Sequence, residues 1–192
     1  MTKYITSLIV AVALGFTACG GGESGNVDSR TSYDLWNYIT SSTNQVKSLD
    51  KYEADSSYSI IGGTEINRAT LTYTILAPTR VEETINDTTS NSSQTIIYST
   101  VDDKISVEGS DTSIPRYQKI GDTINNCTFI SHFDAYSPYN GYKYSDVIQI
   151  KCDNDYSVFY AKGEGKVDYQ GHNQYTGIDD VTTHYYYIML TR

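Results

Sequence analysis

The alternation of short β-forming runs with turn residues is the feature that most limits the fold of this chain. From about Tyr52 onward, runs rich in Thr, Val, Ile and Tyr are interrupted, roughly every 8 to 12 residues, by Gly, Asn, Asp or Pro. In segment 69–75, Leu71, Tyr73 and Ile75 fall on one face and three threonines on the other. This pattern is typical of antiparallel strands with one face in water.

Small and acidic residues mark the predicted turns. Gly62-Gly63 tolerates the positive φ angles of a tight hairpin turn. Pro78 ends a strand, Asp102-Asp103 separates two strands, and Gly163 and Gly165 form a later turn. The strands expected around them cover 94–101, 104–107, 146–152, 156–161 and 181–190.

These strands predict one all-β domain over residues 32–192, in which an antiparallel sheet curls into a barrel or sandwich. The sheet is expected to begin at about residue 52. Segment 32–45 precedes it as a short helix or turn, because Leu35 and Ile39 are four residues apart and Asp34 can cap a first turn. No longer helix is predicted.

The N-terminus has the pattern of an export signal. After Lys3, residues 5–18 form a run of 14 residues without charge. A permanent bilayer span needs about 20 apolar residues, so this run is short for a span and fits a signal peptide. Residues 1–18 are therefore predicted to be removed.

The residues Phe16-Thr17-Ala18-Cys19 resemble the lipobox of bacterial lipoproteins, although Phe16 stands where Leu is usual. The resemblance implies that Cys19 is acylated and becomes the first residue of the mature chain. Residues 19–31, beginning with three glycines after the cysteine, then form a flexible tether. The alternatives are an ordinary signal peptide cleaved after Ala18 or a free cysteine.

The resemblance also implies a destination. In lipoproteins of bacteria with two membranes, an Asp directly after the acylated cysteine often retains the protein in the inner membrane, and here that residue is Gly20. The expected location is the outer membrane, facing the periplasm or the cell surface.

Segments 144–152 and 156–167 resemble a hairpin of uncharacterised bacterial surface lipoproteins and periplasmic β-proteins. The shared pattern is an aromatic residue, Asp-Val and an alternating strand, followed by Tyr-Ala-Lys-Gly-x-Gly, with a departure at Glu164. The resemblance implies a curved antiparallel sheet in a lipoprotein and carries no catalytic residues.

The charge of the chain disfavours nucleic acid as a partner. Removing residues 1–18 takes one lysine and no acid from 14 basic and 23 acidic side chains, which leaves a net charge of −10. A polyanion requires clustered Lys and Arg, and the sequence has no such cluster.

The three cysteines are expected to have two different roles, one as a lipid attachment site and two as a pair. If Cys19 is acylated, Cys127 and Cys152 remain as an even pair in an oxidising compartment, where a disulfide is expected. Two buried free thiols are the alternative. Neither cysteine has a second Cys or a His at the spacing of a metal site.

No stretch of the sequence is a catalytic motif, and neither a catalytic residue, a metal ligand nor a cofactor is assigned. The histidines, His132, His172 and His184, are interpreted as surface residues in two strands and a loop. The acidic groups at 153–155 and 179–180 lack the pattern of a calcium loop and suit turns.

The strongest candidate for recognition is the segment 134–144, which contains four tyrosines: Tyr136, Tyr139, Tyr142 and Tyr144. Exposed tyrosines give large, rigid contact surfaces and stack on sugar rings. The same rings could instead pack over a sheet edge and close the loop.

These observations favour a non-enzymatic, lipid-anchored envelope protein that contacts a protein or glycan partner. The alternative is a carrier of a small molecule or lipid, with an apolar cavity inside the curved sheet. A hydrolase would require a histidine within reach of both a carboxylate and a Ser or Cys.

Overall fold

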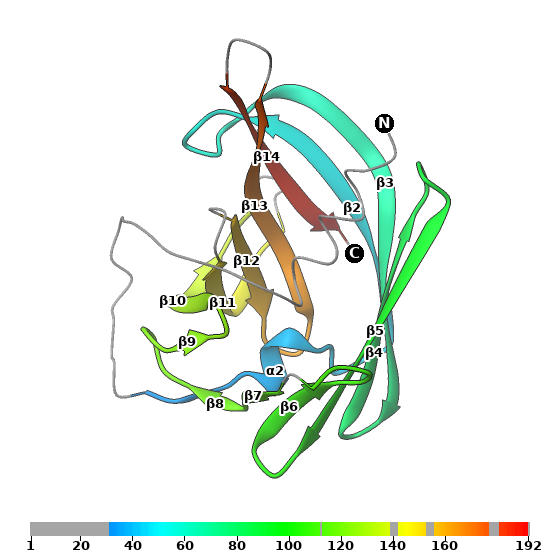
Figure 1. The fold of residues 1–192 in the computed structure, drawn as a ribbon, viewed down its shortest axis with the longest axis vertical. Helices are drawn as coiled ribbons and strands as arrows, with labels where there is room; N and C mark the ends of the chain where they lie inside the picture. The colour runs from blue at the N-terminus through cyan, green and yellow to red at the C-terminus, as the bar shows by residue number, and fades with distance from the viewer. Residues whose placement is uncertain (1–30, 112, 139–141, 153–155, 177–180, 192) are drawn as a thin grey trace.

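The computed structural model describes residues 31–111, 113–138, 142–152, 156–176 and 181–191, with the main chain alone for 63–68, 173–176 and 181–191. Its main feature is one open, curled antiparallel sheet of 12 strands in the order β7-β6-β5-β4-β3-β2-β14-β13-β12-β11-β10-β9 (Figure 1). The prediction of a single curled antiparallel sheet is confirmed. The sheet does not close, because β7 and β9 remain its edges within the described residues.

Two meanders of neighbouring strands make up the sheet. The first contains β2 (Gln45–Ala54), β3 (Ile60–Ala77), β4 (Arg80–Asp87), β5 (Ser92–Val101), β6 (Lys104–Val107) and β7 (Ser113–Pro115). The second contains β9 (Thr123–Ile124), β10 (Cys127–Tyr136), β11 (Tyr144–Cys152), β12 (Tyr156–Ala161), β13 (Gly165–Thr176) and β14 (Val181–Thr191).

Pairing of the last strand with the first long strand joins the meanders. β14 runs antiparallel to β2, from Tyr185 opposite Ala54 to Thr191 opposite Ser48. In Figure 1 the strands of the first meander form a long curved wall, and β10 to β12 stand across from it. The concave faces of the two meanders therefore share one core.

The N-terminal segment lies between these walls (Figure 1). It contains β1 (Tyr33–Asp34), which pairs with β8 (Tyr117–Gln118), and the helix α2 (Trp36–Ile39). Asp34 accepts a hydrogen bond from the Trp36 N–H at 3.2 Å. It is not the N-cap residue that the sequence predicted, because the N-cap is Leu35 and the helix has no side-chain capping bond. Arg116 donates two hydrogen bonds to the same carboxylate, at 2.7 and 2.6 Å. Within the described residues, no helix has the length and apolar character needed to cross a bilayer.

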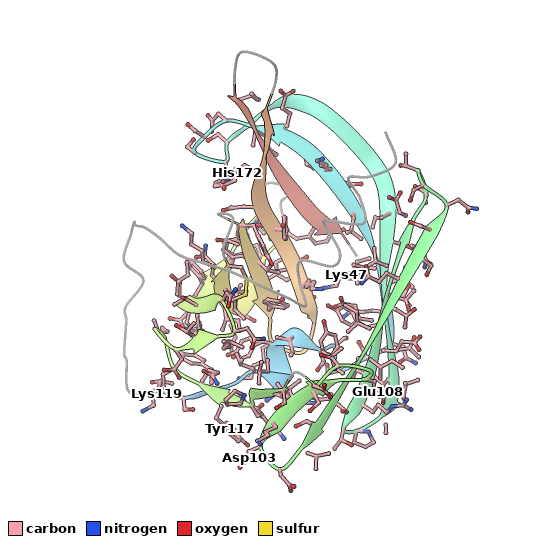
Figure 2. The ribbon with its side chains drawn as sticks, viewed as in Figure 1. Lys47, Asp103, Glu108, Tyr117, Lys119 and His172 are labelled. Carbon is pink, nitrogen blue, oxygen red and sulfur yellow. A yellow bond between two sulfur atoms is a disulfide. The ribbon has the colours of Figure 1, made fainter. Side chains whose placement is uncertain are left out.

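Most of the predicted strands and turns are present. Leu71 and Tyr73 are fully buried on the concave face of β3, as their alternation predicts. The β5–β6 hairpin turns at Asp102-Asp103, with φ angles of 49° and 58°, and Asp103 lies at its tip (Figure 2). Gly163, in the turn before β13, and Gly165, the first residue of β13, have φ angles of 75° and 72°.

The prediction of a turn at Gly62-Gly63 is wrong, because β3 runs through both residues. The chain turns earlier, where the Asp55 carboxylate accepts hydrogen bonds from the N–H groups of Ser57 and Ser59 at 2.8 and 3.0 Å. Aspartate side chains stabilise turns in this way, so the turn forms at the acid rather than at the glycines.

The sheet also begins earlier than residue 52, at Gln45. The first half of β2 shows no alternation of apolar and polar residues, because a lysine, Lys47, occupies a fully buried position. Its Nζ donates to the carbonyl oxygens of Glu164 and Lys166, each at 2.7 Å, so its charge is solvated by the main chain of β13 and the preceding turn (Figure 2).

Gly165 lies directly against the buried side chain of Tyr73. A Cβ atom there would lie 2.5 Å from the Cζ and the hydroxyl oxygen of the buried Tyr73. That hydroxyl is fixed, because it accepts a hydrogen bond from the Lys166 N–H at 3.0 Å. Only glycine fits both this space and the positive φ.

Gly165→Ala is expected to lower the free energy of unfolding by about 2 to 5 kcal/mol, the sum of about 1 to 2 for a left-handed Ala and about 1 to 3 for overpacking. Gly109→Ala is the matched control, because Gly109 has a φ of 77° but no atom within 4 Å of the position that a Cβ would take. Urea denaturation gives the free energy of unfolding of both variants. The extra loss in Gly165→Ala measures the steric clash with Tyr73, because both variants share the cost of a positive φ. Equal losses in the two variants would contradict the packing argument.

Candidate functional site

A cavity of about 120 Å³ lies between the facing halves of the sheet. Its wall is mainly apolar and comes from three parts of the chain. Leu35 and Ile39 contribute from the N-terminal segment, Ile105 from β6, and Ile150 and Val158 from the second meander. The cavity exists because side chains from two curved walls and a four-residue helix meet without filling the space between them.

The predicted cysteine pair forms part of this wall. Cys127 and Cys152 lie opposite each other on β10 and β11, and their Sγ atoms are 2.09 Å apart. Both residues line the cavity. A bridge between residues 25 positions apart in the chain is expected to stabilise the fold by about 3 kcal/mol.

Two nearly buried tyrosines are among the lining residues of the cavity. Tyr98 of β5 and Tyr160 of β12 come from opposite meanders, line the cavity, and are 8% and 7% exposed. Within the described residues, neither hydroxyl forms a hydrogen bond. Burial first, and then the charge of Glu83, raise the pKa of both hydroxyls well above the usual value for tyrosine, so both stay protonated.

Glu83, whose charge acts on both tyrosines, belongs to an ion pair. Its side chain is buried, and its Oε1 accepts a hydrogen bond from Lys166 Nζ at 2.6 Å. The other oxygen, Oε2, has no hydrogen-bond partner among the described residues. A buried ion pair of this kind adds little net stability, but loss of one partner leaves an uncompensated charge.

A second, polar pocket of about 550 Å³ lies where the N-terminal segment meets β10 and β11. Asp146 is at its centre, with a φ of 55°. Its carboxylate is 2.9 Å from His132 Nε2 and accepts hydrogen bonds from Lys162 Nζ at 2.7 Å and from the hydroxyl of Tyr38. The carboxylate therefore links α2, β10, β11 and the β12–β13 turn.

This pocket meets only one requirement of a hydrolase. His132 reaches a carboxylate, but no Ser or Cys side chain of the described residues forms a hydrogen bond with it. The described residues also contain no group of three or more His, Cys, Asp or Glu that could hold a metal ion. The cluster around Asp146 is therefore best explained as a polar tie between elements.

The histidines differ from their predicted positions. The side chain of His132 is 19% exposed and packs against Tyr33, at 5.0 Å between ring centroids, whereas the sequence predicted an exposed face. His172 lies in β13 and not in a loop (Figure 2). The side chain of His184 and the acidic groups at 153–155 and 179–180 lie outside the described residues.

The tyrosines of segment 134–144 are mostly packed. Tyr136 ends β10, stacks on Phe159 with ring centroids 4.7 Å apart, and donates a hydrogen bond to Asp168. Tyr144 lies directly opposite Tyr136 and is 3% exposed. Tyr142 is 37% exposed, and Tyr139 lies outside the described residues. Of the described tyrosines in this segment, Tyr142 is the most exposed, and more than half of its surface is still covered.

Comparison with known proteins gives little more. No protein-family model matches the sequence, and no curated protein matches it. A solved structure of a LolA superfamily protein from Nitrosomonas europaea covers 80% of this chain and 87% of its own, at 8% sequence identity and a TM-score of 0.25. A likeness this weak carries no argument about function.

The pKa of the Asp146 carboxyl lies below its usual value. Burial raises it, but hydrogen bonds from Lys162, Tyr38 and His132 together lower it by more. A depressed pKa in the folded state means that ionised Asp146 stabilises the fold above the unfolded pKa, about 3.9. That stabilisation is lost as the pH falls through the folded-state value.

Asp146→Asn should therefore flatten the rise of the free energy of unfolding with pH in the region around and below about pH 4. Asparagine tolerates the positive φ at this position, so the change isolates the charge. Urea denaturation at a series of pH values measures the effect. Asp134→Asn, at a fully exposed side chain in the same pocket, is the control. A profile for Asp146→Asn parallel to that of the wild type would contradict the prediction.

Proposed function

We propose that this chain is a lipid-anchored protein of the bacterial envelope whose β-domain binds a small apolar molecule, or the end of an alkyl chain. The observation that supports this function best is the mainly apolar cavity of about 120 Å³ between the two halves of the sheet. An engineered apolar cavity of about 150 Å³ in another protein stays dry and binds benzene or xenon. The cavity of this chain is of a similar order.

The size of the cavity limits the ligand. Pockets for drug-sized ligands measure about 300 to 1,000 Å³. A cavity of about 120 Å³ holds a single ring or a few methylene groups, and not a whole lipid. The proposed function is therefore narrower than the carrier of a complete lipid, and it is binding without chemical conversion.

A function as an interaction module has less support. Its basis in the sequence is the set of tyrosines in segment 134–144, and Tyr136 and Tyr144 contact the protein's own β-sheet. Tyr142 remains as an exposed ring that a protein or glycan partner could contact. One ring is a small basis for recognition, because interface energy concentrates in clustered, buried anchors.

Benzene should raise the melting temperature of the wild-type protein in a concentration-dependent way, because a ligand that binds only the folded state stabilises it. Val107→Phe, which places a larger side chain at the cavity wall, should reduce or abolish this shift. Val101→Phe makes the same change at a side chain that is 67% exposed and should keep the shift. Calorimetric scans with increasing benzene test both expectations. A wild-type protein with an unchanged melting temperature at saturating benzene would refute the proposed function.

The anchor depends on Cys19, which lies outside the described residues, and rests on the lipobox resemblance. Cys19→Ala should abolish labelling by radioactive fatty acid and move the protein from the outer-membrane fraction to the soluble fraction, since acyl chains hold a protein to a bilayer by about 0.8 kcal/mol per buried CH₂. Ser24→Ala, in the same tether, should leave both unchanged. Retention of Cys19→Ala in the outer membrane would contradict the anchor.

A further inference from the structure

We propose that the ligand of the cavity carries one uncharged hydrogen-bonding group, such as an alcohol, and that the hydroxyls of Tyr98 and Tyr160 bind this group. The inference rests on the proposed function, because it specifies the chemistry of the same cavity. The inference predicts that the cavity prefers neutral amphiphiles to pure hydrocarbons and to fatty-acid anions.

The first argument is the state of the two hydroxyls. Buried polar groups in proteins are almost always hydrogen-bonded, and an unsatisfied one costs about 1 to 3 kcal/mol. Tyr98 and Tyr160 are 8% and 7% exposed, line the cavity from opposite meanders, and form no hydrogen bond with a described residue. Their hydroxyls are not among the fully enclosed polar atoms without a partner, so they keep accessible surface that a ligand can contact. A polar group on a bound ligand would supply the missing partner for one or both of them.

The second argument is charge. Among the described residues that line the cavity, none is Lys, Arg or His, so a buried anion would have no counter-charge. Glu83, whose charge raises the pKa of both tyrosines, does not line the cavity and offers an anion no counter-charge. Lys166 already pairs with Glu83 at 2.6 Å, which lessens any attraction for a cation. The group that fits this environment best is therefore neutral.

Three probes with one ring in common test the inference on the full processed protein: benzene, phenol and benzoate. In a purely apolar cavity, phenol binds more weakly than benzene because its buried hydroxyl loses its bonds to water. Here phenol is expected to bind at least as tightly as benzene at pH 7, and benzoate more weakly than either. Titration calorimetry gives the three dissociation constants.

The double variant Tyr98→Phe with Tyr160→Phe removes only the two hydroxyls. It should weaken phenol binding about three- to tenfold, the worth of a typical hydrogen bond, and leave benzene binding unchanged. Tyr117→Phe, at a tyrosine of β8 that is 48% exposed, is the matched control and should leave both ligands unchanged. If the double variant does not fold, the wild-type ratio of phenol to benzene still decides the question.

The outcomes separate the two proposals. If benzene fails to bind, the proposed function is refuted, and this inference, which rests on it, is refuted with it. If benzene binds and phenol binds more weakly, or if phenol binding is unchanged in the double variant, this inference alone is overturned. Benzoate binding more tightly than phenol would overturn the assignment of an uncharged group.

Discussion

The turn between β12 and β13 is the point on which the rest of the structure depends, because the N-terminal segment and both meanders bond to it. The Gly163 N–H donates to the Asn37 carbonyl at 2.6 Å, and its own carbonyl accepts from the Ser42 N–H at 2.8 Å. The next residue, Glu164, accepts a hydrogen bond from Lys47 of β2 at 2.7 Å. Main-chain groups inside a protein need partners, so these bonds fix the helix and β2 together.

The cavity follows from this arrangement. The bonds to the turn hold α2 between the two walls (Figure 1), where Ile39 and the preceding Leu35 contribute to the cavity wall. Across the cavity, the cysteine pair joins β10 to β11 and fixes the other side. Fixed walls cannot collapse inward to close a small void, and a preformed void spares the ligand the cost of opening one. The hydrogen bonds of the turn and the cysteine pair thus support the binding role that we propose.

The sequence predicts those parts of the fold that depend on neighbours along the chain. Alternation identified the buried face of β3 through Leu71 and Tyr73, and the parity of the cysteines identified Cys127 and Cys152 as a pair. Prediction from the sequence failed where the burial of a residue depends on a group far along the chain. Lys47 is buried because its charge is solvated by the carbonyl oxygens of Glu164 and Lys166. No local pattern could show such a partner, and a lysine normally indicates an exposed position.

The sequence suggested an apolar cavity inside the curved sheet only as an alternative, and its lining could not be predicted, since Tyr98 and Tyr160 line it from two meanders that curl toward each other. These two rings lie largely inside the fold, and their hydroxyls form no hydrogen bond with any described residue. Phenylalanine would fill nearly the same space without a polar atom to desolvate. Tyrosine at both positions therefore gives the cavity two hydroxyls that phenylalanine would lack, and the proposed ligand group would bond them.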